Sequence, residues 1–81
     1  MPSTGLSAMR KPARLYHHLG QNLASARQRK NWTQERAAER CSVSLKYWQS
    51  LEGGHKAPAF ATLCRIRAVL GANWNDLCRS C

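Results

Sequence analysis

Residues 45–52 combine two kinds of side chain at helical spacing. Trp48 and Leu51 recur on one side of a helix, which predicts an apolar face that packs against the protein. The opposite side carries hydrogen-bonding groups. In the major groove of duplex DNA, lysine can donate to O6 and N7 of guanine, and a glutamine amide can pair with N6 and N7 of adenine. The chemistry predicted for this outer face is therefore the reading of base edges, by Lys46, Gln49 and Ser50.

The residues around this segment predict that it is the second of two short helices. Thr33 can cap a first helix through its hydroxyl, and Ser44 can cap the second in the same way. The chain is predicted to turn at Ser42. Gly53 and Gly54 end the second helix, since glycine accepts the left-handed conformation of a helix C-terminus without steric cost. A helix pair of this size usually places its second helix in the DNA major groove.

The remaining segments look like scaffold. A first helix is predicted from Leu15 to about Asn31, and two more are predicted after the loop at residues 55–58. Ala59 is a poor N-cap for the first of these two, which ends at Gly71. The apolar stripes consist of Leu15, Leu19, Leu23 and Ala26, then Leu63, Ile66 and Leu70, and finally Trp74, Leu77 and Cys78.

Length and charge limit the function classes. Eighty-one residues allow one small domain, and a net charge of +9 favours polyanionic partners, nucleic acid first and acidic membrane surfaces second. Four bases nearly balance three acids over residues 35–56, so we expect generic phosphate attraction to come largely from the amino-terminal third of the chain. Its bases are Arg10, Lys11, Arg14, Arg27, Arg29 and Lys30, with no acid before Glu35.

The two ends of the chain are predicted to be tails. Residues 1–14 are basic and rich in small residues, which predicts a disordered segment, and residues 79–81 form a short carboxyl-terminal tail around a domain at 15–78. Whether the first tail lies along DNA is open. The opening residues lack the apolar centre of a signal peptide and no apolar stretch is long enough to span a membrane, so we expect a cytoplasmic protein.

Catalytic and metal sites have little support in the sequence. Cys78 and Cys81 form a CxxC pair, but Cys41 and Cys64 are isolated within predicted helices, so the paired spacing of a zinc ribbon is absent. These two thiols are predicted to be small core residues. The role of the terminal pair is open. Two adjacent histidines point about 100° apart on a helix, and four acids offer no carboxylate pair. We therefore expect no enzyme, metal or cofactor.

Residues 19–78 resemble the phage repressor, or Cro/CI-type (XRE), helix-turn-helix family. The resemblance implies an all-α fold, a compact five-helix bundle of the lambda repressor type without strands. Ser42 stands where the family usually has the turn glycine, Trp48 where a buried aliphatic is usual, and Arg67 where a small core residue is usual. The matching residues are Thr33, Gln34, Ala38, Val43, Ser44, Leu51, Glu52, Gly54, Pro58, Thr62, Leu63, Ile66, Leu70, Gly71 and Leu77.

The resemblance also implies individual roles. Arg27 and Glu52 are expected to form a structural salt bridge rather than to touch DNA. Trp48 is expected in the core. The Tyr47 ring can pack while its hydroxyl reaches a phosphate, and both roles stay open. Gln34 is expected against a phosphate. The implied DNA-binding residues are Gln34, Ser44, Leu45, Lys46, Gln49, Ser50, His55 and Lys56, of which Leu45 would meet a thymine methyl group and the last two would follow the backbone.

Together these features predict a sequence-specific regulator that binds double-stranded DNA. We expect a repressor that binds a palindromic operator as a homodimer, because one recognition helix covers too few base pairs for operator affinity. The alternative is an antitoxin-type or adaptor protein that uses the same fold mainly to bind a protein partner such as a toxin. A nonspecific basic nucleic-acid binder is a third interpretation. Prophage repressors, restriction-modification controllers and antitoxins all occur among small members of the family.

Overall fold

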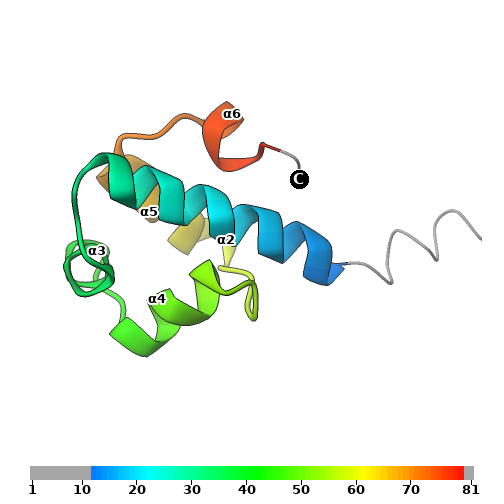
Figure 1. The fold of residues 1–81 in the computed structure, drawn as a ribbon, viewed down its shortest axis with the longest axis horizontal. Coiled ribbons are helices and arrows are strands. Elements are labelled where there is room, and N and C mark those ends of the chain that lie inside the picture. Colours follow the sequence, from blue (N-terminus) through cyan, green and yellow to red (C-terminus); the bar gives the residue numbers. More distant parts are fainter. Residues whose placement is uncertain (1–11, 80–81) are drawn as a thin grey trace, which may run out of the picture.

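The computed structural model describes residues 12–79, and every regular element in that range is a helix (Figure 1). Neither strand nor bridge occurs within it. The predicted all-α fold with five helices is confirmed. The helices are α2 (Pro12–Arg29), α3 (Gln34–Arg40), α4 (Leu45–Glu52), α5 (Phe60–Leu70) and α6 (Trp74–Leu77).

The long helix α2 begins three residues before the start that the leucine spacing predicts. Pro12 is its first residue, and proline suits the first helical turn because its φ is already helical and its missing N–H would have no partner there. Residues 12–14 therefore belong to a helix, and the predicted disordered tail is wrong for them. The rest of that tail, residues 1–11, and residues 80–81 lie outside the described part of the chain.

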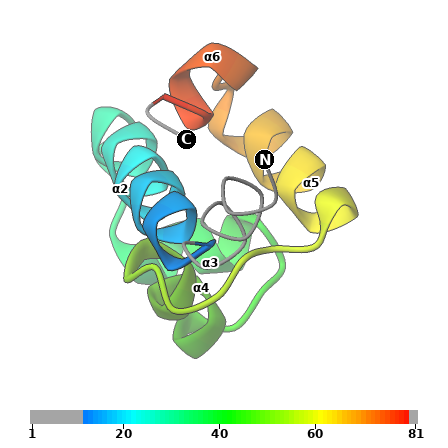
Figure 2. The ribbon, with the colours of Figure 1, turned by 90° about the vertical axis from the view of Figure 1, so that its right-hand side faces the viewer.

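All five helices contribute to the core, α3 through Ala37 and Ala38. Leu23 of α2, Trp48 and Leu51 of α4, Ile66 of α5 and Leu77 of α6 are all at most 1 % exposed. Figure 2 shows α2 and α5 on opposite sides of this core, with α6 above and the pair α3 and α4 below. The apolar stripes predicted from the sequence supply these side chains. The stripe ends are less buried: Leu15 is 46 % exposed and Trp74 39 %.

The turn between α3 and α4 satisfies the carbonyls that end α3. Ser42 takes a left-handed conformation, with φ of 59°. Its N–H donates to the Glu39 carbonyl at 3.2 Å, and the next N–H, that of Val43, donates to the Ala38 carbonyl at 3.0 Å. This pair of bonds is the Schellman motif, whose left-handed position usually holds glycine. A serine therefore occupies a position with a steric cost.

The end of α4 has the same motif, with the glycine that the sequence predicts. Gly54 has φ of 77°, whereas Gly53 stays in the right-handed region. A Cβ on Gly54 would lie 2.8 Å from the Cα of His17, so the loop after α4 passes close to the backbone of α2. Both the dihedral angle and the space require glycine at this position.

The side chains that the sequence assigns to helix starts are confirmed as caps. The Thr33 hydroxyl accepts from the N–H of Arg36 at 3.0 Å, and the Ser44 hydroxyl accepts from the N–H of Tyr47 at 3.0 Å. Each bond satisfies one of the free N–H groups of a first turn. Ala59 offers α5 no side-chain cap, as expected.

Gly20 determines how closely α2 approaches α4, and the sequence analysis did not single it out. The residue is buried, and a Cβ built on it would lie 2.4 Å from the carbonyl oxygen of Leu51 and 2.6 Å from that of Glu52. Any side chain would push the last turn of α4 away from α2. The close packing of these two helices therefore depends on a residue without a Cβ.

Arg67, at a position where a small core residue is usual, is half-buried and reaches the segment that leads into α6. The guanidinium donates to the carbonyl of Ala72 at 3.3 Å and lies 5.3 Å from the ring centroid of Trp74. Its Nε is buried and has no hydrogen-bond partner among the described residues, so the guanidinium is only partly satisfied at this position. No helix within residues 12–79 has both the length and the apolar character needed to cross a membrane.

Candidate nucleic-acid interface

Helix α4 has one buried face and one face open to solvent. Trp48 and Leu51 are buried, at 0 % and 1 % exposure, and Lys46 and Gln49 are exposed. Leu45 is half-buried. The predicted amphipathic character of this helix is confirmed. Two of the side chains expected to read bases are thus accessible to a partner as large as a DNA duplex.

Ser50 and Ser44 make bonds within their own helix. The Ser50 hydroxyl donates to the carbonyl of Lys46 at 3.0 Å, and the residue is half-buried. Its single O–H is therefore used inside the protein, and its oxygen is left to accept. Ser44 is exposed, and its hydroxyl oxygen accepts the capping bond, which leaves its O–H to donate elsewhere.

A bidentate ion pair joins α4 to α2. Arg27 Nε lies 2.6 Å from Oε2 of Glu52, and Arg27 Nη2 lies 3.2 Å from Oε1. The side chains are only 13 % and 8 % exposed. Arg27 Nη1 also donates to the carbonyl of Trp32 at 2.7 Å, so one guanidinium ties together α2, the turn after it and α4. Two short, charge-assisted bonds give this pair a defined geometry.

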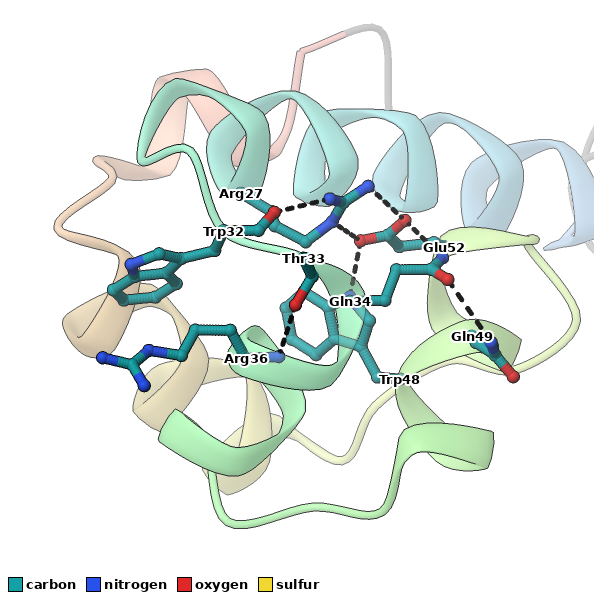
Figure 3. A network of polar contacts seen from close by, with 8 residues as sticks. All are labelled: Arg27, Trp32, Thr33, Gln34, Arg36, Trp48, Gln49 and Glu52. Carbon is teal, nitrogen blue, oxygen red and sulfur yellow. Dashed lines mark hydrogen bonds and ion pairs between the residues drawn. The ribbon is translucent and has the colours of Figure 1, made fainter.

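Two further side chains donate to the same carboxylate (Figure 3). The indole N–H of Trp48 donates to Oε2 of Glu52, and Gln34 Nε2 donates to Oε1 at 2.9 Å. The Glu52 carboxylate therefore receives donors from α2, α3 and α4. The bond from Trp48 was not predicted, although a spacing of four residues on one helix indicates that the two side chains are neighbours.

Gln34 lies inside this network rather than apart from it. Its Oε1 accepts from Nε2 of Gln49 at 3.3 Å, and the residue is half-buried. The expected place of Gln34 is against a phosphate, and its remaining N–H is compatible with that contact. What the sequence analysis missed is that Gln34 links the buried carboxylate to an exposed side chain of α4.

The loop after α4 returns toward the side of that helix. Lys56 Nζ lies 5.7 Å from the ring centroid of Tyr47, and both Lys56 and His55 are exposed. Tyr47 is half-buried and its ring packs against the core. A cation over an aromatic face restricts where the ammonium group can lie. The positive charge of the loop is therefore held beside the exposed face of α4.

One base of the amino-terminal third, Arg27, is less available than the sequence indicates, whereas Lys30 is exposed. Arg27 is committed to Glu52, and Lys30 Nζ lies 5.3 Å from the ring centroid of Trp32. Arg14 and Arg29 are exposed, whereas Arg10 and Lys11 lie outside the described residues. Phosphate attraction from this third of the chain stays a prediction, and it depends on fewer bases than composition alone would give.

The described cysteines, Cys41, Cys64 and Cys78, are free thiols. Cys41 is fully buried, which confirms its predicted core role, and Cys64 is half-buried. Burial raises the pKa of the Cys41 thiol, and this effect exceeds the opposing one of the nearby Arg65 guanidinium. No cluster of three or more metal-ligating side chains occurs among residues 12–79. Cys78 is exposed, and its CxxC partner Cys81 lies outside that range.

Comparison with known proteins identifies the class to which this fold and this interface belong. Residues 18–77 match the model of the helix-turn-helix domain family, and the chain belongs to that family. No curated protein matches the chain. Two solved structures are similar to it, and both are described as regulators.

The clp gene regulator ClgR from C. glutamicum is 35 % identical, with a TM-score of 0.74 over 78 % of this chain and 81 % of that one. The hypothetical transcription factor NHTF from Neisseria is 26 % identical, with a TM-score of 0.73 over 79 % and 74 %. The family and these structures support a DNA-binding regulator of transcription.

Proposed function

We propose that this chain is a repressor of the Cro/CI type that reads duplex DNA with the exposed face of α4. The observation that supports this proposal most is the division of that helix. Trp48 and Leu51 are buried and Glu52 is held by α2 and α3, while Lys46 and Gln49 on the other side are open. A helix anchored along one side presents its outer side chains in a defined orientation, which base readout requires.

Lys46 and Gln49, the exposed side chains expected to read bases, each have a matching base edge. Lys46 would donate to O6 and N7 of guanine, and Gln49 would pair with N6 and N7 of adenine. Leu45, at the start of α4, would contact a thymine methyl group. Ser50 contributes less than Gln49, because its hydroxyl already donates within the helix. The outer face thus combines direct readout with an apolar contact.

Phosphate contacts would flank these base contacts. Lys56 and His55 lie in the exposed loop after α4, and Ser44 lies exposed at its start. Gln34 has one N–H left for a phosphate oxygen once the other has bonded to Glu52. Contacts of this kind set the register of the helix on the duplex and carry no sequence information themselves.

The proposed functional unit is a homodimer on a palindromic operator. One recognition helix reads one half-site, and two-fold related half-sites about 10 base pairs apart multiply affinity and specificity. A dimer bound over a promoter would exclude the transcription machinery, which is the basis for proposing repression.

This proposal is tested by letting the full chain select duplexes from a pool of random sequences. The expected outcome is an inverted repeat with half-sites about one helical turn apart, together with lower expression of a reporter gene whose promoter contains the selected site. A pool that shows no enriched sequence would contradict specific reading. An enriched site without symmetry would contradict the dimer.

One observation supports an antitoxin-type or adaptor function as the second candidate. Phe60 is 75 % exposed, and its ring stacks on that of Trp74 with centroids 6.3 Å apart and planes 6° apart. Exposed aromatic pairs of this kind are typical of protein interfaces. The variant Phe60→Ser separates the two functions. If the pair belongs to the dimer, the variant is monomeric and binds the operator weakly; if it binds another protein, dimer and operator affinity are unchanged.

A further inference from the structure

A chain of two hydrogen bonds connects the buried carboxylate of Glu52 to the exposed amide of Gln49 (Figure 3). Gln34 stands between them: its Nε2 donates to Glu52 Oε1 at 2.9 Å, and its Oε1 accepts from Gln49 Nε2 at 3.3 Å. We infer that Glu52 and Gln34 are positioning residues that determine which way round the Gln49 amide faces a base. This inference rests on the proposed function, since it concerns how that function achieves specificity.

The direction of the chain originates at Glu52. A carboxylate only accepts hydrogen bonds, so the Gln34 amide must turn its nitrogen toward it. Glu52 cannot rotate away, because two nitrogens of Arg27 and the indole of Trp48 also donate to its oxygens and its side chain is only 8 % exposed. The two ends of the Gln34 amide are therefore distinguished by the protein itself.

The same constraint passes from Gln34 to Gln49. With its nitrogen on Glu52, Gln34 turns its oxygen outward, and an amide oxygen only accepts. Gln49 must then use one N–H of its own to reach that oxygen. Its carbonyl oxygen and its second N–H stay free, side by side. An acceptor beside a donor is the pattern that matches N6 and N7 of adenine. The opposite orientation of the amide would exchange donor and acceptor and lose this match.

A merely structural role for Gln34 makes a different prediction. If the residue only stabilises the α3–α4 corner, or only contacts a phosphate, its loss weakens binding to every duplex by the same factor. If it positions Gln49, its loss changes the preference between bases at one position of the half-site. Base preference at that position is therefore the informative measurement, and overall affinity is not.

The experiment uses the full chain and a duplex selected by the wild-type protein. The position at which Gln49→Ala loses base preference is identified first. The selected duplex is then compared with its three variants at that position. Gln34→Met keeps the length of the side chain and removes its hydrogen bonds. We expect it to reduce the preference for adenine at that position about tenfold, whereas loss of the phosphate contact proposed for Gln34 would lower affinity for every duplex by the same factor and leave that preference unchanged. In the double variant that combines Gln34→Met with Gln49→Ala, the loss of base preference should equal that of Gln49→Ala alone.

Gln28→Met is the matched control, since Gln28 is exposed on α2 and its side chain lies outside the network. It should leave base preference unchanged. A smaller second variant, Gln34→Ala, should give the same loss as Gln34→Met, and circular dichroism verifies that each variant is folded. Unchanged preference in folded Gln34 variants would overturn the inference and leave the proposed function intact. A wild-type protein without any base preference would overturn the proposed function itself.

Discussion

Arg27 and Glu52, 25 residues apart in the chain, form an ion pair with two hydrogen bonds between α2 and α4. The pair lies behind the exposed face of α4 and is almost fully shielded from water. It therefore connects the stability of the domain with the placement of the side chains proposed to contact DNA.

Removal of Arg27 should destabilise the domain strongly. In Arg27→Ala the Glu52 carboxylate stays buried without its cation, so we expect a loss of about 3–5 kcal/mol in the free energy of unfolding. Urea denaturation followed by circular dichroism measures this loss. Arg36→Ala is the control, because its ion pair with Glu39 spans 3.9 Å on the surface and should contribute less than about 1 kcal/mol. Equal effects of the two variants would contradict the account of the buried pair.

Replacement of Trp48 by phenylalanine tests the bond from its indole. Trp48→Phe retains most of the apolar volume but leaves Glu52 with one donor fewer, and we expect a cost of about 1.5–3 kcal/mol for the bond to a charged group. Trp74→Phe is the matched control. Trp74 is 39 % exposed and interacts with Arg67 through its ring face, so that change should cost less than about 1 kcal/mol. Thermal unfolding distinguishes these outcomes.

Ser42→Gly should make the domain more stable. Ser42 has φ of 59°, and glycine adopts this region without the steric cost that a Cβ brings, so we expect a gain of about 0.5–1 kcal/mol. Ser25→Gly, at an exposed position inside α2, should instead cost about 0.5 kcal/mol, because glycine is a poor helix former. Destabilisation by Ser42→Gly would show that the serine contributes a contact that outweighs its strained backbone.

Thiol labelling should distinguish Cys41 from Cys78. Burial raises the pKa of the Cys41 thiol, so less of the reactive thiolate is present at neutral pH, and access to it is blocked as well. We expect iodoacetamide to modify exposed Cys78 in the native protein and Cys41 only after addition of denaturant, as read by mass spectrometry of peptides. Rapid labelling of Cys41 in native protein would mean that the corner between α3 and α4 opens readily.

The starts of α3 and α4 could be predicted because local chemistry specifies them, whereas α2 begins at Pro12, three residues before its predicted start. The hydroxyls of Thr33 and Ser44 and the spacing of Trp48 and Leu51 each act within one turn of helix, and the structure has all four in their predicted roles. The position of the turn at Ser42 was predicted, but its left-handed backbone conformation was not. A serine by itself does not indicate a left-handed backbone.

The contacts between helices could not be predicted in the same way. Nothing local marks Gly20 as the point where α2 meets the carbonyls that end α4. The link from Glu52 through Gln34 to Gln49 depends on the relative positions of α3 and α4, which short-range patterns do not specify. The resemblance to the family predicted that Arg27 pairs with Glu52. It did not predict the further side chains that donate hydrogen bonds to the Glu52 carboxylate.

The affinity of Gln49→Ala for two duplexes shows whether the exposed face of α4 reads bases. The duplexes are the site selected by the wild-type protein and a scrambled sequence of the same length and composition, compared at one salt concentration. We predict that the variant loses about 1–3 kcal/mol on the selected site and nothing measurable on the scrambled one. Equal losses on both duplexes, or no loss on either, would contradict the claim that the exposed face of α4 reads bases.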